Sequence, residues 1–140
     1  MANLHPYLVF NGNCQEAMEF YKRCLGGELE LNTVAGSPVA DQMPAEMQDK
    51  ILHSMLTSGD IVIMAADMVG EEGYKPGNTI ALNLLCESTE ELERLFSSLS
   101  EGGLVTQPVG DEFFGTFGAL TDRFGVGWML LYLGAEDTTA

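Results

Sequence analysis

Positive charge is scarce in this sequence. Its 140 residues include 6 Lys+Arg against 21 Asp+Glu, which gives a formal net charge of −15 at pH 7. Binding to nucleic-acid phosphates or anionic lipids needs clustered basic side chains, so we expect neither a nucleic acid nor a membrane among its partners. The same charge opposes the approach of anionic small molecules, so a neutral or cationic ligand is favoured.

Long apolar runs and cysteine motifs are also missing. No stretch approaches the roughly 20 apolar residues that cross a bilayer, and the first residues do not show the pattern of a secretory leader. The three cysteines follow no spacing motif, and an odd number of them is typical of reduced thiols. We therefore expect a cytoplasmic protein.

Apolar residues are abundant enough for a folded core. Hydrophobic residues make up 46% of the sequence and charged residues 19%, a balance that excludes a disordered chain. A chain of this length is expected to form a single domain, 1–140.

Two segments of the chain resemble each other. Residues 13–16 and 88–91 both have the form of a helix-capping box, with a polar N-cap residue followed by Glu three residues later. A glycine pair follows each predicted helix, at 26–27 and at 102–103, where a left-handed C-cap is favoured. Between box and glycines lies an apolar stripe at helical spacing, formed by Ala17, Phe20, Tyr21 and Cys24 in the first copy and by Leu92, Leu95, Phe96 and Leu99 in the second. The stripes are offset by 75 residues throughout, which indicates an internal duplication.

Strand-like runs surround each predicted helix, one before it and three after it. They lie at 4–10, 28–34, 51–57 and 61–66 in the first copy, and at 79–85, 104–107, 114–121 and 127–133 in the second. The predicted fold is therefore α+β, with two tandem βαβββ modules that form a curved mixed sheet around a central trough, helices outside. We expect module one at 1–67, a linker at 68–77, module two at 78–134 and a polar tail at 135–140.

The cysteines are expected to be structural. Cys14 follows a helix N-cap, where the helix dipole can lower the pKa of a thiol, but no His–Asp pair or second cysteine accompanies it in the sequence. Cys24 continues the apolar stripe, and Cys86 ends an apolar strand. We therefore predict no cysteine nucleophile.

The two-module pattern, with a histidine on the first strand, resembles the vicinal-oxygen-chelate superfamily, which includes glyoxalase I, extradiol dioxygenases, and fosfomycin and bleomycin resistance proteins. The segments that carry the resemblance are 6–17, 20–21, 26–27, 51–54, 117–118 and 122–128. Within the superfamily they are most similar to the PhnB-like branch, also described as a 3-demethylubiquinone-9 3-methyltransferase domain. The sequence has no Gly-rich strand-loop-helix that would hold an adenosyl cofactor.

The resemblance implies four positions for metal ligands, which in superfamily enzymes carry His or Glu. They correspond here to His5, Met64, Thr79 and Met129, so His5 alone matches. Thioether and hydroxyl groups do not replace carboxylate and imidazole around a hard or borderline cation. We therefore expect no cofactor and no metal site.

A second chelate remains open as an alternative. If Gly59 and Asp60 form a two-residue turn, Met55 lies opposite Met64, and alternation places His53 on the same face. A divalent metal would then need a carboxylate beside the histidines, and Asp67 or Asp122, at strand ends, are the candidates.

Three functions follow. The first is a module that binds a small organic molecule without changing it. The second is a metal-free enzyme with His53 or His5 as general base, since an imidazole titrates near neutral pH. The third is a metal-dependent lyase, isomerase or dioxygenase. The predicted ligand contacts are His5, Tyr7, His53, Met55, Met64, Thr79, Trp128 and Met129.

The resemblance also implies a homodimer. Half-barrel sheets have edge strands with unpaired backbone groups, and superfamily members cover these edges by pairing two chains about a twofold axis. Whether the modules pair within one chain or between two, and which molecule is bound, the sequence leaves open.

Overall fold

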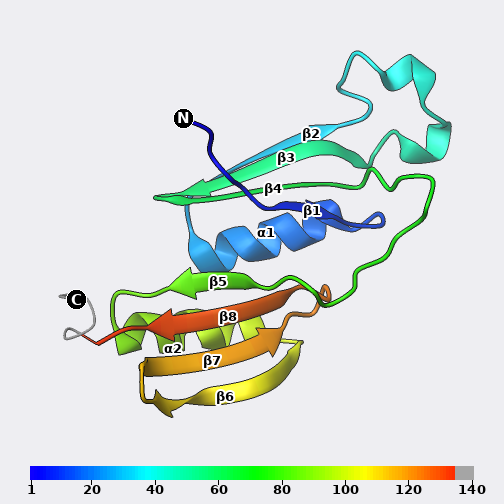
Figure 1. Ribbon diagram of the computed structural model, residues 1–140. Coiled ribbons are helices and arrows are strands. Elements are labelled where there is room, and N and C mark those ends of the chain that lie inside the picture. The colour runs from blue at the N-terminus through cyan, green and yellow to red at the C-terminus, as the bar shows by residue number, and fades with distance from the viewer. Residues whose placement is uncertain (135–140) are drawn as a thin grey trace. The chain divides into compact units, whose positions relative to one another are not determined.

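Each half of the chain folds as a four-stranded sheet with one helix packed on it (Figure 1). The computed structural model describes residues 1–134, so the predicted tail at 135–140 lies outside the described residues. The chain divides into two compact units, Met1–Lys75 and Pro76–Ala140. The first contains β1 (Tyr7–Val9), α1 (Cys14–Leu25), β2 (Glu28–Thr33), β3 (Ile51–Ser58) and β4 (Ile61–Ala66); the second contains β5 (Leu82–Leu85), α2 (Thr89–Ser100), β6 (Leu104–Glu112), β7 (Gly115–Thr121) and β8 (Gly127–Tyr132).

The two units have the same topology. Strand order is β1-β4-β3-β2 in the first sheet and β5-β8-β7-β6 in the second. In each sheet the first strand pairs in parallel with the last, and the other pairs are antiparallel. This confirms the α+β class and the two βαβββ modules. Each module has a mixed sheet of its own, and the shared trough stays a prediction.

Both helices bury the predicted stripe. All eight stripe residues are buried, because residues three and four apart share one face of a helix and that face packs on the sheet. Cys14 and Met18 extend the buried face of α1. The glycine pairs end the helices as expected, with positive φ at Gly26 and Gly102.

The two predicted capping boxes have different outcomes. In α2 the box is confirmed, because Ser88 Oγ accepts from the backbone N–H of Glu91 at 3.1 Å and Glu91 Oε1 accepts from the N–H of Glu87 at 2.8 Å. In α1 the prediction is wrong, because Asn13 makes no side-chain cap bond. Asp67 binds the start of the helix in another way, since its Oδ1 accepts from the N–H of Cys14 at 3.0 Å.

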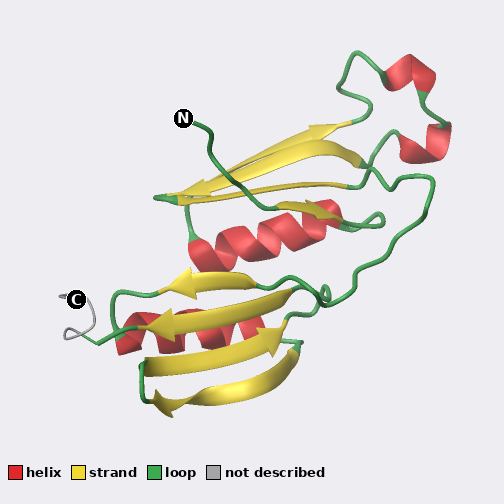
Figure 2. Ribbon diagram, viewed as in Figure 1, coloured by secondary structure: helices red, strands yellow, loops and turns green. Residues whose placement is uncertain are grey.

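The connection between β2 and β3 contains two 3-10 turns, Ala40–Gln42 and Ala45–Met47 (Figure 2). Gln48 ties them together, since its Nε2 donates to the carbonyl oxygens of Ala40 at 2.9 Å and Met43 at 3.1 Å. Among residues 1–134 no helix is long and apolar enough to cross a bilayer.

Candidate ligand-binding face

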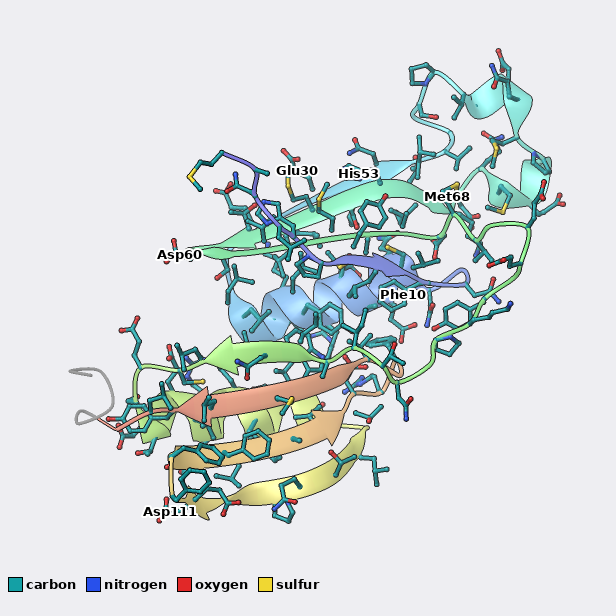
Figure 3. The ribbon with its side chains drawn as sticks, viewed as in Figure 1. Phe10, Glu30, His53, Asp60, Met68 and Asp111 are labelled. Atoms are coloured by element: carbon teal, nitrogen blue, oxygen red, sulfur yellow. The ribbon has the colours of Figure 1, made fainter. Side chains whose placement is uncertain are left out.

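The first sheet has one face covered by α1 and one that α1 leaves open. Cys14 Sγ of α1 lies 3.6 Å from Ser54 Oγ of β3, so Ser54 points toward the helix. Successive side chains of a strand point to opposite faces, so the neighbours of Ser54, His53 and Met55, point away from α1. Figure 3 shows His53 and Glu30 on this side of the sheet. We call it the open face of the first sheet.

Four side chains form a row across this open face. Strand register pairs Tyr7 with Met64, Met64 with Met55, and Met55 with Glu30. Tyr7 is 50% exposed, and the two methionines are half-buried. The row therefore runs from an aromatic ring on β1, over two thioethers, to a carboxylate on β2. The pairing of Met55 with Met64 is the one that the turn at 59–60 predicted.

His53 lies next to this row. Its Nδ1 is 3.5 Å from the hydroxyl oxygen of Tyr7, and the ring centroids are 6.1 Å apart with 32° between the planes. Either group can donate, depending on the tautomer of the imidazole. The structure thus brings together Tyr7, His53, Met55 and Met64 of the predicted contacts.

The other predicted contacts do not belong to this row of paired residues. His5 and Thr79 are exposed and lie outside the strands, before β1 and β5. Trp128 is 1% exposed, and its Nε1 donates to Asp122 Oδ2 at 2.8 Å. Met129, its neighbour, is 38% exposed and points to the opposite side of the second sheet. We therefore leave Trp128 out of the proposed contacts, because it belongs to the core beneath that sheet.

Glu30 is a residue of the open face that the sequence analysis missed. The predicted contacts of the first sheet were centred on histidine and methionine residues, and β2 carries neither. The signal was present in the alternation of β2, in which Leu29 and Leu31 are half-buried while Glu28, Glu30 and Asn32 are exposed.

The second sheet has an equivalent row with different chemistry. Register pairs Asn83 with Met129, Met129 with Ala119, and Ala119 with Gln107. By topology these four residues occupy the positions of Tyr7, Met64, Met55 and Glu30, and Phe117 occupies that of His53. The two sheets therefore share topology and register at these positions but carry different side chains there.

The same equivalence corrects one position inferred from the resemblance. His5 lies two residues before Tyr7, and the residue two before Asn83 is Ala81, so the counterpart of His5 is Ala81 rather than Thr79. Alanine offers no metal ligand.

The residues at the implied metal positions do not fit a divalent cation. Met64 and Met129 present thioethers, which are poor ligands for hard or borderline ions. Among residues 1–134 no three His, Cys, Asp or Glu side chains come together to hold a metal.

The two carboxylates considered as substitutes already have N–H partners. Asp67 Oδ1 accepts from the N–H groups of Gly12 and Cys14, and its Oδ2 accepts from the N–H of Ile51. Asp122 Oδ1 accepts from the N–H groups of Phe124 and Val126, at 2.8 and 3.1 Å. Both carboxylates hold the backbone at the end of a strand.

Burial makes two of the thiols poor nucleophiles. Desolvation raises the pKa of Cys14 to about 11, and the charge of Asp67 adds to the rise while the hydrogen bond with Ser54 opposes it. Desolvation also raises the pKa of Cys86 to about 11, with a further rise from Glu91. The desolvation of Cys14 outweighs the helix dipole that the sequence suggested.

A depression of about 400 Å³ lies in the second unit, lined by Leu85, Cys86, Glu87, Tyr132 and Leu133. Its lining is mostly apolar, and Cys86 in it is buried. None of the side chains on the open face of the first sheet contributes to it.

Comparison with known proteins identifies the family. The sequence profile described as 3-demethylubiquinone-9 3-methyltransferase matches residues 2–131. The chain belongs to this family. Protein YjdN of Escherichia coli strain K12 is 33% identical over 147 residues, covering 96% of this chain and 98% of its own.

Solved structures agree with this family assignment. Protein PA1353 of Pseudomonas aeruginosa is 41% identical, with a TM-score of 0.85 over 95% of this chain and 98% of its own. The PhnB protein of Bacillus cereus, described with the family's methyltransferase name, is 26% identical, with a TM-score of 0.71 over 94% and 99%. A glyoxalase/bleomycin resistance protein/dioxygenase domain from Frankia shares the fold, at 15% identity and a TM-score of 0.64 over 96% and 94%. The resemblance to the PhnB-like branch is confirmed, and the likeness to the Frankia domain shows that the fold is the one found in the superfamily.

The methyltransferase name of the family implies an adenosyl cofactor, which the residues present do not fit. A strand-loop-helix that holds such a cofactor is rich in glycine. Here the β1–α1 connection has one glycine, Gly12, and the β5–α2 connection has none. We therefore derive no step through this cofactor.

Proposed function

We propose that this protein binds a small organic molecule on the open face of the first sheet and does not change it chemically. The observation that carries the proposal is the cluster of Tyr7, His53, Met55 and Met64 on a sheet face that α1 leaves open. Methionine side chains adapt to the shape of a guest, and the tyrosine ring offers a flat apolar surface with a polar edge. His53 supplies a donor or an acceptor that orients the guest.

The charge of the chain supports a neutral or cationic ligand. The net charge is −15, and none of the six Lys and Arg residues belongs to β1, β2, β3 or β4. An anion approaching this face would meet repulsion without a basic partner.

Replacing Tyr7 with alanine is expected to weaken binding about tenfold, because aromatic side chains often dominate contact energies. Met64→Gln is expected to act in the same direction by making the centre of the row polar. The ligand is first found by thermal shift in a library of neutral and cationic aromatic compounds, and its dissociation constant is then measured by calorimetry.

Tyr74→Ala is the matched control, since Tyr74 is 37% exposed and lies in the chain segment that connects β4 to β5. It should leave binding unchanged. The proposal is wrong if no compound shifts the melting temperature, or if Tyr7→Ala and Tyr74→Ala bind equally well.

An enzyme is the second candidate, and the contact between Tyr7 and His53 favours it. An imidazole beside a hydroxyl group can act as general base without a metal. Mass spectrometry of the bound compound after incubation separates the two functions, and we expect the compound unchanged. A product that forms with wild-type protein but not with His53→Gln would show that the protein is an enzyme and that the proposed binding function is wrong.

We also propose that the protein is a homodimer in the cytoplasm. The sheets end in edge strands, β1 and β2 in the first and β5 and β6 in the second, and pairing two chains is a common way to cover such edges. Cys14, Cys24 and Cys86 are buried and none of them forms a disulfide, which suits a reducing compartment. Light scattering is expected to give about twice the chain mass of 15.2 kDa. A monomer mass that persists on concentration would contradict the dimer.

A further inference from the structure

The row across the first sheet is electrically asymmetric. Its β2 end carries Glu30, and Glu28 lies two residues away on the same face of that strand. Among residues 1–134, no hydrogen bond or ion pair engages the carboxylate of either. Lys50, the basic residue next to β3, is turned elsewhere, since its Nζ donates to the carbonyl oxygen of Gly12 at 3.3 Å. The negative charge at this end is therefore uncompensated.

The other end of the row is uncharged and aromatic. From Tyr7 on β1 to Glu30 on β2 the row crosses three strand spacings, which is about 14 Å. Met64 and Met55 fill the interval with two half-buried thioethers. A guest lying along the row would meet a flat ring, then a soft apolar surface, then a carboxylate.

The second sheet shows that the acid is a local feature. In the equivalent row, Gln107 occupies the place of Glu30 and Asn83 that of Tyr7. Gln and Glu have nearly the same shape, so the two rows differ at this position mainly in charge.

We propose that the ligand is an organic cation that carries a flat apolar group. This inference rests on the proposed binding function and specifies its ligand class and orientation. The apolar group lies over Met55 and Met64 beside Tyr7, and the cationic nitrogen lies at Glu30. Contacts between thioethers and an aromatic ring favour the first placement, and charge complementarity favours the second.

The test uses three naphthyl probes with the same alkyl linker, which end in trimethylammonium, hydroxyl or carboxylate. Calorimetry at low salt is expected to show the ammonium probe binding about fivefold more tightly than the hydroxyl probe, a ratio suited to an exposed charge pair, with the carboxylate probe weakest. The preference should shrink at high salt because ions screen an exposed pair. In Glu30→Gln, the ammonium and hydroxyl probes should bind alike.

Glu93→Gln is the matched control, because it changes the net charge equally at an exposed position on α2. It should keep the preference for the ammonium probe, and circular dichroism checks that both variants are folded. The inference is overturned if Glu93→Gln removes the preference as fully as Glu30→Gln does.

The remaining outcomes distinguish a failure of this inference from a failure of the proposed binding function. If the ammonium and hydroxyl probes bind wild-type protein equally well and Tyr7→Ala weakens both, the ligand is not selected for its positive charge. The inference is then wrong, and the proposed binding function is still supported. If no probe binds, the proposed function and the inference both fail.

Discussion

Replacing Asp67 with alanine is expected to lower the free energy of unfolding by about 4 kcal/mol, since each buried amide that loses its partner costs about 1 to 3 kcal/mol. Asp67 is 4% exposed, and its carboxylate accepts three backbone hydrogen bonds. Two of the donors, the amides of Cys14 and Ile51, belong to residues that are almost fully buried. One side chain thus joins the start of α1, the start of β3 and the end of β4.

Urea unfolding followed by far-UV circular dichroism measures this loss. Hydrogen exchange at the amides of Cys14 and Ile51 should accelerate in Asp67→Ala. Asp67→Asn should be intermediate, because its amide keeps one acceptor oxygen but turns a second donor toward the N–H groups. Asp60→Ala, in the exposed β3–β4 turn, is the control and should change stability by less than about 0.5 kcal/mol. An Asp67→Ala variant as stable as this control would contradict the assigned role.

The role of Asp67 was beyond the sequence because it depends on a contact across 53 residues. The helices, their stripes and their glycine stops were predictable, since each follows from residues a few positions apart. Asn13 had the right type for a cap, but the fold instead brings a carboxylate from the end of β4 to other amides at the start of α1, those of Gly12 and Cys14. A sequence pattern over a few residues cannot show whether a nearby side chain or one far along the chain will bind the amides at the start of a helix.

The edge strands show the same limit. β1 is shorter than the predicted run at 4–10, and β5 is shorter than that at 79–85, although both are edge strands like the longer β6. β6 is longer than predicted, since it continues to Glu112 despite Pro108 and Gly110. A register shift between Gln107 and Gly110 accommodates Pro108, and another lies between Val105 and Gln107. An edge strand tolerates such shifts because one of its sides is unpaired.

At the site, the pairing of β3 with β4 was predictable from the sequence, but the face on which Trp128 lies was not taken from strand alternation. The β3–β4 turn set the register that places Met55 opposite Met64. Trp128 was assigned to the same surface as Met129, although adjacent strand residues point to opposite faces. Its indole instead meets Asp122, and the burial of Leu120 and Leu130 marks that face as the core.

Alkylation of Cys14 and Cys86 in the folded protein is expected to be about 100-fold slower at pH 8 than alkylation of an ordinary thiol. The thiolate is the reactive form, and burial raises both pKa values from 9.0 to about 11. About one of these thiols in a thousand is then ionised at pH 8, against about one in ten for an unperturbed thiol. Iodoacetamide labelling with peptide mapping measures each site separately.

The alkylation rate should rise about tenfold for each pH unit between 8 and 10, because the thiolate fraction does.

The free energy of unfolding should instead fall as the pH rises. A thiol whose pKa is raised by folding contributes its stabilisation fully below pH 9, and this is lost as the pH rises toward 11, since the unfolded chain ionises first. Ser97→Cys, exposed on α2, provides the fast reference, and unfolding in urea should make all three native cysteines reactive. If Cys14 in the folded protein is labelled at a rate within tenfold of this reference, desolvation does not control its reactivity. Cys14 would then again be a candidate nucleophile at the start of α1.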